Sequence, residues 1–593
     1  MRILYNSLDN FHKTPFGALK TGQKCTIKIL VPVSCPAVKV YLITEFTNQT
    51  NKFECQREEV KNGYVAFKTE FILDEPGLYF YWFEIIKEDG SFRLFKQGNG
   101  TNMEAGDKWQ ITCYDKDYSA PEWAKGAVIY QIFPDRFCIG KPADLSDKIK
   151  PFKLHTSVNE TPDSFPDEEG NWNTDFFGGN LSGIIDKLDY LCELGIDAIY
   201  LNPILKALSN HRYDTADYKK VDPMLGTEED FKSLCDSAHK RGIKIILDGV
   251  FSHTGKKSIY FDDALENENS KYRSWYEFYE FPNKYRCWWG IDTLPQIRRN
   301  HKGFAEFIAG NDDSVIDFWT ALGADGIRLD VADELSDELI ELIRKKGRSV
   351  KNDFLVMGEV WEDASNKMSY GEQRKYLFGK ELDSVMNYPF LNLICDFVKE
   401  RLCASDFANG VMNIVENYPT DMLHCSMNLL SSHDTVRIIT RLGADNLDIS
   451  REEKANHKLN CKEFAEKLVK VAVFLQFTLP GTPSIYYGDE IGMEGFEDPF
   501  NRRFFDWSKT RCSLLEFFKN MCKLKHKYSS LKKGNIEFFS EGNVLMFSRN
   551  FDGENVKMVV NMSENEFVLN GDIIFAENSS GNKLPKYGFA LYQ

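Results

Sequence analysis

The chain has 593 residues, with 73 Lys and Arg against 89 Asp and Glu, so its formal net charge is −16. Hydrophobic residues make up 42% and charged residues 27%, which is typical of globular proteins and excludes a mainly disordered or fibrous chain. The acidic balance argues against nucleic acid or an anionic membrane surface as a partner, because neither offers counter-charge to a net anion.

The cysteines and the apolar segments indicate the compartment. The 14 cysteines are scattered from Cys25 to Cys522 without a Cys-x-x-Cys pair, so they fit neither a structural zinc site nor a small disulfide framework. Residues 1–10 lack the apolar core of a signal peptide. No segment reaches the ~20 apolar residues of a membrane-spanning helix. We therefore expect a soluble cytoplasmic protein with reduced thiols.

The first part of the chain has the pattern of an all-β domain. Runs rich in β-branched and aromatic residues at 25–33, 38–44 and 78–85 are separated by turns that contain Pro or Gly. Short strands with frequent turns are typical of a β-sandwich. We expect this N-terminal domain to occupy residues 1–122 and to bind carbohydrate or to form a dimer interface.

A strand–helix alternation follows the N-terminal domain. Helical patterns such as 181–195 and 228–242 lie between short apolar strands, and this alternation predicts an α/β fold, a (β/α)8 barrel over residues 123–530. An irregular aromatic-rich insertion at about 252–300 interrupts the third unit, and residues 531–593 return to short strands of a C-terminal β-sandwich. The eight predicted strands are 128–133, 198–201, 243–251, 326–331, 354–360, 384–387, 426–431 and 484–487.

Four of these strands end in carboxylates. Active sites of barrel enzymes lie at the carboxyl ends of the strands, so these side chains are expected on one rim. One such Asp alone is more often an exposed strand end or a helix cap. Four together, beside an arginine and two histidines, favour a catalytic site. The residues are Asp248 and His253 after the third strand, Arg328 and Asp330 after the fourth, Glu359 and Trp361 after the fifth, and His433 and Asp434 after the seventh.

Converging carboxylates with an arginine suit glycoside hydrolysis, which needs one ionised and one protonated carboxyl group. Arg328 and Asp330 are two residues apart on a strand, so both side chains point to the same face. The guanidinium can then keep Asp330 ionised as a nucleophile. Glu359 has no cation beside it in sequence, and desolvation near Val360 and Trp361 would raise its pKa and suit a general acid. Asp434 would be a third carboxylate that binds sugar hydroxyls.

The four strand-end motifs resemble the signature regions of the α-amylase superfamily, family 13 of the glycoside hydrolases. Segments 177–181, 188–191, 202–204, 210–218 and 481–492 resemble further parts of that family, and the resemblance covers residues 128–507. Within the family the chain is most similar to the cyclomaltodextrinase, neopullulanase and maltogenic amylase group, which carries an N-terminal β-sandwich. The resemblance to this group implies a homodimer formed through the N-terminal domain, with restricted access to the active site.

The resemblance also implies a role for each matching residue. Asp330 would be the nucleophile, Glu359 the general acid/base and Asp434 the transition-state stabiliser. Trp361 would form an aromatic wall on the leaving-group side, and Glu334 would lie near the acceptor subsites. Tyr213 would stack under the sugar in the cleaved subsite, surrounded by His211, Asp248, His253, Arg328 and His433. Tyr213 and Trp361 could alternatively be core aromatics.

Three departures from the family pattern limit these implications. Ser252 stands where the family usually has Asn, which puts a calcium ligand or loop anchor in doubt. The calcium loop of the group is rich in Asn and Asp, whereas residues 137–144 read FCIGKPAD, so the usual ligands are largely missing; no cofactor is required by the sequence, and calcium stays an alternative. Residues 288–297 differ from the Met-Pro-Lys-Leu-Asn typical of cyclomaltodextrinases, which leaves the cyclodextrin preference open.

The resulting hypothesis is a retaining hydrolase of α-1,4 bonds in maltooligosaccharides, cyclodextrins, pullulan or starch, with transglycosylation as a side reaction. A 4-α-glucanotransferase or an α-glucosidase shares the same catalytic set and stays an alternative. A non-catalytic barrel that only binds sugar is the remote alternative, since such a protein would be expected to have lost one of the three carboxylates.

Overall fold

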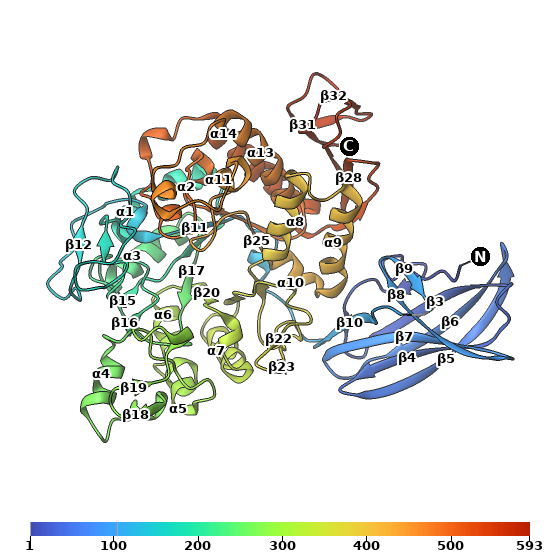
Figure 1. Cartoon of the computed structure of the whole chain (residues 1–593), viewed down its shortest axis with the longest axis horizontal. Coiled ribbons are helices and arrows are strands. Elements are labelled where there is room, and N and C mark those ends of the chain that lie inside the picture. Colours follow the sequence, from blue (N-terminus) through green and yellow to red (C-terminus); the bar gives the residue numbers. More distant parts are fainter. Residues whose placement is uncertain (1, 104) are drawn as a thin grey trace. The chain divides into compact units, whose positions relative to one another are not determined.

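The computed structural model describes residues 2–103 and 105–593 (Figure 1). The chain forms two compact units. The first comprises Met1–Ser119, Asp363–Asp383 and Asp406–Leu423, and the second comprises Ala120–Glu362, Ser384–Ser405 and His424–Gln593. The domain boundaries predicted at residues 122 and 530 stay predictions.

The first unit contains an antiparallel β-sandwich whose two layers share one long strand. Strand β5 (Gln49–Lys61) pairs with β4 through residue Cys55 and with β6 from residue Gln56 onward, so it passes from one layer to the other. Tyr79, Tyr81 and Phe83 alternate along β7 and lie in the core between the layers. The other strands are β1 (Lys13–Thr14), β2 (Leu19–Lys20), β3 (Lys24–Pro32), β4 (Ala37–Phe46), β6 (Tyr64–Ile72), β7 (Gly77–Lys87), β8 (Gly90–Gln97), β9 (Gly100–Asn102) and β10 (Trp109–Tyr114).

The second unit is built on a parallel barrel, as predicted. Its eight strands are neighbours in the order β24-β21-β20-β17-β14-β11-β26-β25, and a parallel bridge between Met386 and Met427 joins the two ends of this sheet. The strands are short and buried apart from Lys244 at the start of β17, because helices cover their outer face. They are β11 (Ile129–Ile132), β14 (Ala198–Leu201), β17 (Lys244–Gly249), β20 (Gly326–Leu329), β21 (Leu355–Gly358), β24 (Ser384–Val385), β25 (Met427–Leu429) and β26 (Thr482–Tyr486).

The connecting helices largely follow the predicted alternation. The helix predicted over 181–195 is in fact two helices, because Lys187 leaves the helical backbone conformation between them. Asn180 caps the first of the two by accepting from the amide of Gly183. The main helices are α1 (Leu181–Asp186), α2 (Leu188–Leu194), α3 (Glu228–His239), α6 (Val315–Ala321), α7 (Asp337–Val350), α8 (Tyr388–Val398), α9 (Ala404–Asn417), α10 (Thr420–Cys425), α11 (Ile438–Gly443), α12 (Arg451–Asn456), α13 (Lys462–Thr478), α14 (Ser513–Lys527) and α15 (Ser529–Lys533).

Two additions interrupt or follow the barrel. The predicted insertion in the third unit contains α4 (Ile259–Glu266), the hairpin β18 (Phe278–Glu280) and β19 (Lys284–Tyr285), and α5 (Lys302–Ala305), which lie together in green in Figure 1. The predicted C-terminal β-domain is an antiparallel sheet with a small core around Val559 and Leu584. Its strands are β27 (Asn535–Phe538), β28 (Val544–Phe551), β29 (Glu554–Asn561), β31 (Ile573–Glu577) and β33 (Gly588–Tyr592), with a separate pair β30 (Phe567–Val568) and β32 (Lys583–Leu584).

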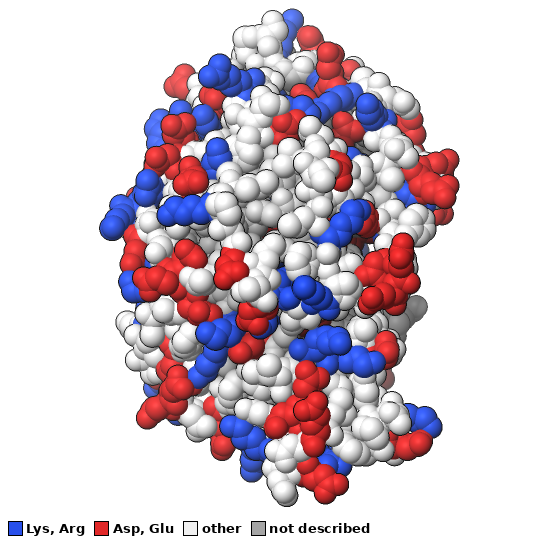
Figure 2. All heavy atoms as spheres, turned by 90° about the vertical axis from the view of Figure 1, so that its left-hand side faces the viewer, with Lys and Arg blue, Asp and Glu red and all other residues white. Residues whose placement is uncertain are grey.

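The surface carries charges of both signs. Figure 2 shows Lys and Arg interspersed with Asp and Glu on one face, with uncharged areas between them. On this face the net charge of −16 is therefore not gathered into one extended acidic area. Among the described residues, no helix is long and apolar enough to cross a membrane.

Candidate active site

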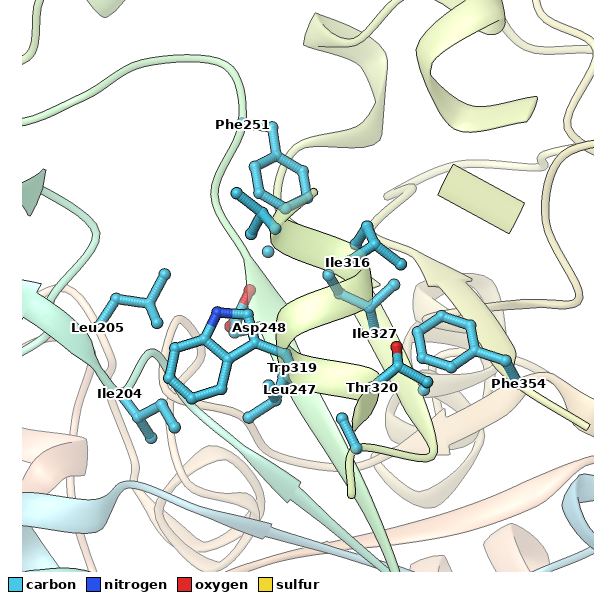
Figure 3. Close-up of a pocket in the computed structure, with 14 residues that line it drawn as sticks. Ile204, Leu205, Leu247, Asp248, Phe251, Ile316, Trp319, Thr320, Ile327 and Phe354 are labelled. Atoms are coloured by element: carbon cyan, nitrogen blue, oxygen red, sulfur yellow. The ribbon is translucent and has the colours of Figure 1, made fainter. Parts of the chain in front are cut away.

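The candidate site lies at the carboxyl ends of β17, β20 and β21. Asp248 and Arg328 are direct partners in the parallel register of β17 and β20, so their side chains project side by side from the same face. Their sequence neighbours Leu247 and Ile327 point the other way and pack with Trp319 of α6 in the apolar layer behind the strands (Figure 3). This alternation directs the two charged side chains into the barrel.

Arg328 is the hub of the site. Its Nη1 atom lies 2.8 Å from Asp248 Oδ1 and 2.9 Å from Asp330 Oδ1. Its Nη2 atom lies 2.8 Å from Glu359 Oε2. The sequence predicted the contact with Asp330 but not the ion pair with Glu359, which comes from the neighbouring strand. One fully buried guanidinium therefore holds three carboxylates at fixed positions.

A strained turn after Asp330 helps to orient Glu359. Val331 has a φ of 37° and a ψ of 67°, a left-handed conformation that is costly for a β-branched residue. In this conformation its amide donates to Glu359 Oε2 at 2.8 Å. The other carboxylate oxygen, Oε1, accepts from Trp361 Nε1 at 3.0 Å. Both oxygens of Glu359 are thus held by donors.

A chain of close polar contacts connects Asp434 to Asp248. Gln131 Nε2 donates to His433 Nδ1 at 3.0 Å, so the proton of the neutral imidazole lies on Nε2. This Nε2 lies 3.0 Å from Asp434 Oδ2 and 2.5 Å from the hydroxyl of Tyr213. The hydroxyl of Tyr213 in turn donates to Asp248 Oδ2 at 2.9 Å. The rings of Tyr213 and His433 stack with a centroid distance of 5.4 Å.

Burial perturbs the acids and bases of this cluster in opposite directions. Burial raises the pKa of Asp330, repulsion from Glu359 adds to the effect, and the Arg328 guanidinium opposes it. Burial and the charge of Glu359 raise the pKa of Asp434 to about 7. Burial lowers the pKa of His433 and lowers that of His253 to about 4, so both imidazoles are neutral at pH 7. Neutral imidazoles can both donate to and accept from sugar hydroxyls.

Aromatic side chains form one side of the site. Trp361 is 47% exposed and stacks on Tyr388 with a centroid distance of 4.0 Å, so one face of the indole stays open. In the insertion, Trp288 packs against His253 and stacks on Trp289. The indole of Trp289 donates to Glu334 at 3.3 Å, which joins Glu334 and His253 through the tryptophan pair.

A buried cation, Lys148, binds the backbone at the start of the loop that carries His211 and Tyr213. Lys148 Nζ donates to the carbonyl of Ala207 at 2.6 Å and to Asp222 Oδ2 at 2.8 Å, and the side chain of Lys148 is fully buried. Within the same loop, Ser209 Oγ lies 3.1 Å from His211 Nδ1. No pattern in the sequence indicates this role of Lys148.

The structure places nine of the eleven predicted site residues in one chain of direct contacts, and it connects the other two, Glu334 and His253, to each other through Trp289 and Trp288. Sequence reasoning missed Arg502, whose Nη2 lies 3.7 Å from Asp434 Oδ1 and whose Nε donates to the carbonyl of His433. Asp498, four residues before it, forms an ion pair with Arg502, with Oδ1 2.8 Å from Nη1. The sequence signal that could have indicated Arg502 is the charged segment that follows the last strand of the barrel.

The segment 137–144 does not fit a calcium site. Asn180 Oδ1 already accepts from the amide of Gly140, and Asn180 Nδ2 donates to the carbonyl of Lys141. Asp144 Oδ1 accepts from Ser146 within its own turn. Calcium needs six to eight oxygen ligands, and these oxygens are already bound to protein donors. Ser252 Oγ lies 2.9 Å from His253 Nδ1, so it does make the local bond that a shorter side chain allows.

Comparisons with known proteins identify relatives in the α-amylase family. The family model described as the alpha amylase catalytic domain matches residues 131–535. The chain is 36% identical to an amylopullulanase of Thermoanaerobacter thermohydrosulfuricus, over 92% of this chain but 40% of that protein. It is 34% identical to a cyclomaltodextrinase of Geobacillus thermopakistaniensis, over 80% of this chain and 78% of that protein.

The fold of the chain is also similar to that of a solved structure. The cyclic alpha-maltosyl-(1→6)-maltose hydrolase from Arthrobacter globiformis superposes with a TM-score of 0.67 at 29% identity, over 80% of this chain and 99% of that chain. The chain spans less than half the length of the curated amylopullulanases that it matches.

Proposed function

Because the chain belongs to the α-amylase family, we propose that it is a retaining α-glucan hydrolase with Asp330 as nucleophile, Glu359 as general acid/base and Asp434 as transition-state stabiliser. The observation that carries this proposal is the bridge of Arg328 between Asp330 and Glu359. Retaining enzymes hold their two carboxyl groups about 5–5.5 Å apart, closer than inverting enzymes do. Two carboxylates bound to one guanidinium fit such a close pair.

In the proposed reaction, Asp330 attacks the anomeric carbon while Glu359 protonates the departing glycosidic oxygen. The bond between carbon and that oxygen breaks, and a covalent glycosyl ester forms on Asp330. Glu359, now ionised, takes a proton from water, whose oxygen displaces Asp330. A second sugar hydroxyl in place of this water gives transglycosylation. Asp434 would hold sugar hydroxyls and stabilise positive charge at the anomeric carbon.

The proposed substrates are α-1,4-linked glucans. Maltooligosaccharides, cyclodextrins, pullulan and starch fit the names of the amylopullulanase and cyclomaltodextrinase relatives. A neutral substrate is also consistent with a site whose single arginine hub is already engaged by three carboxylates. The face of Tyr213 opposite His433 and the open face of Trp361 supply apolar surfaces for sugar rings.

The nucleophile assignment is tested with Asp330→Asn. The amide keeps the volume of the side chain but cannot form the ester, so turnover of every α-glucan should fall by orders of magnitude while circular dichroism stays native. Near-normal turnover would contradict the assignment. Product analysis of the wild type with β-cyclodextrin, pullulan, maltotriose and soluble starch separates a hydrolase from a glucanotransferase or an α-glucosidase.

The cellular context is also part of the proposal. We infer a cytoplasmic enzyme that forms a homodimer through its N-terminal β-sandwich. The free thiol state of all 14 cysteines, none of which lies at the two undescribed positions, supports a reducing compartment. Size-exclusion chromatography with light scattering tests the dimer, and a monomer at micromolar concentration would contradict it.

A further inference from the structure

A pocket with an excess of cationic side chains lies outside the residues that the proposed mechanism uses. Its volume is about 290 Å³, close to the lower end of the range for small-molecule sites, about 300–1,000 Å³. Its walls come mainly from residues 158–160, 454–462, 491–496 and 503–509, all in the second unit. Five of the lining side chains are Lys or Arg, and three are Asp or Glu. In a chain of net charge −16, such a local excess of cations favours an anionic ligand.

Arg503 carries a positive charge that the protein leaves largely uncompensated. Its side chain is half-buried, and its Nη2 atom donates to the carbonyl of Ala455 at 2.7 Å. Within residues 2–103 and 105–593 it makes no ion pair and no other hydrogen bond. Burial lowers the pKa of Arg503, the charge of Glu494 opposes this effect, and that of Arg437 adds to it. The remaining N–H donors of the guanidinium are thus available to a ligand in the pocket.

The segment between α12 and α13 adds two further donors. Lys458 is exposed at the pocket, and it has no ion-pair partner in the part of the chain that the structure describes. The ring of His457 lies edge-on to Phe496, with a centroid distance of 5.0 Å, and an imidazole carries an N–H in either tautomer. Arg503, Lys458 and His457 therefore present N–H groups to one cavity.

The carboxylates of the pocket do not neutralise these cations, because other protein groups already bind them. His155 Nδ1 lies 2.6 Å from Glu160, the amide of Leu459 lies 3.0 Å from Glu494, and Lys509 Nζ lies 2.9 Å from Asp506. Two of the other lysines are engaged in a similar way, Lys454 by Glu497 at 2.5 Å and Lys462 by the carbonyl of Gly492 at 3.0 Å. Arg503 and Lys458 are left to bind a ligand.

We propose that this pocket binds a small anion of the phosphate class through Arg503 and Lys458. The oxygens of a phosphate group match the planar fork of a guanidinium, and its negative charge compensates both cations. A neutral sugar would leave these charges uncompensated. Inorganic phosphate and the phosphoryl group of a sugar phosphate share this chemistry. Arg503 directly follows Arg502, so the bound anion would contact the segment that also carries the cation nearest to Asp434.

The test is isothermal titration calorimetry of the full chain with inorganic phosphate and with glucose 6-phosphate, at constant ionic strength. For the wild type we expect a dissociation constant of about 1 mM for at least one of the two probes. Arg503→Gln should weaken this binding about tenfold or more, because it removes charge-assisted hydrogen bonds. Lys458→Gln changes an exposed side chain without a protein partner, so it should fold normally and weaken binding about threefold.

The matched control is Lys523→Gln, which removes the same charge from an exposed lysine of α14 outside the pocket and should stay within about twofold of the wild type. Tighter binding of glucose 6-phosphate than of inorganic phosphate would support a phosphate monoester as the ligand, and equal affinities would support the free anion.

Three results would overturn the inference. They are dissociation constants above about 20 mM for both probes, affinities that do not change in Arg503→Gln and Lys458→Gln, and an equal weakening in Lys458→Gln and Lys523→Gln, which would indicate only a general effect of charge. None of these results depends on the hydrolysis of α-glucans, so the inference and the proposed function can fail separately.

Discussion

Replacement of Asp434 by Asn should stabilise the fold at neutral pH while it abolishes activity. Burial and the neighbouring Glu359 hold the pKa of Asp434 at about 7, against 3.8 for an ordinary Asp. Between about pH 4 and pH 7 the carboxyl group is ionised in the unfolded chain but still protonated in the folded protein. The free energy of unfolding therefore falls as the pH rises through this range. Full ionisation corresponds to roughly 4 kcal/mol, and because the side chain is 31% exposed, solvent screening reduces this to about 1–3 kcal/mol.

The assay is the unfolding midpoint of the wild type and Asp434→Asn as a function of pH. The amide has nearly the shape of the carboxylate, so the variant removes the charge and can keep an oxygen 3.0 Å from His433 Nε2. We expect equal midpoints near pH 4 and a higher midpoint for the variant at pH 8. The exposed Asp572→Asn is the control and should show no such trend. A variant that is less stable at pH 8, or a difference that does not depend on pH, would refute the reasoning.

Two further predictions concern Glu359 and Lys148. Glu359→Ala should lose about 10²–10⁴-fold in kcat/KM on natural glucans, and far less on dinitrophenyl glycosides, whose leaving group needs little protonation; equal losses would contradict an acid role. Lys148→Met should lower the free energy of unfolding by about 3 kcal/mol, because the buried Asp222 loses its shorter ion pair and keeps only the contact with Arg212 at 3.5 Å. The neighbouring Lys206→Met, which removes a partly exposed ion pair with Asp147, should change it by less than about 1 kcal/mol, and similar losses in both variants would contradict the role given to Lys148.

The barrel could be predicted from the sequence because each of its layers leaves a local pattern. Strands buried on both faces are continuous apolar runs between helical patterns of 3.6-residue period, and the residues that follow them are polar, so the strand segments and the polar rim could be identified. The break between α1 and α2 at Lys187 could not be predicted, since the apolar pattern continues across it.

The site was predicted less completely than the fold, for a physical reason. The pairing of Arg328 with Asp330 follows from a spacing of two on one strand. The pairing of Arg328 with Glu359 depends on the register between two strands, which places Leu329 beside Gly358 and so sets both strand ends at the same level. Lys148 lies 74 positions before Asp222, and no periodic pattern connects them. Contacts of this kind are set by the closed barrel and not by local spacing.

The distribution of cations explains how a strongly acidic site can remain folded. Asp248, Asp330 and Glu359 share the charge of Arg328, and Asp434 lies farther from Arg502, at 3.7 Å. The charge of Asp434 is therefore poorly compensated in the free protein, and a substrate whose anomeric carbon gains positive charge would reduce the cost of its ionisation only in the transition state. The same unfavourable charge that lowers the stability of the free protein would in this way favour the reaction, which is the physical reason to expect a gain in stability and a loss of activity from a single amide substitution.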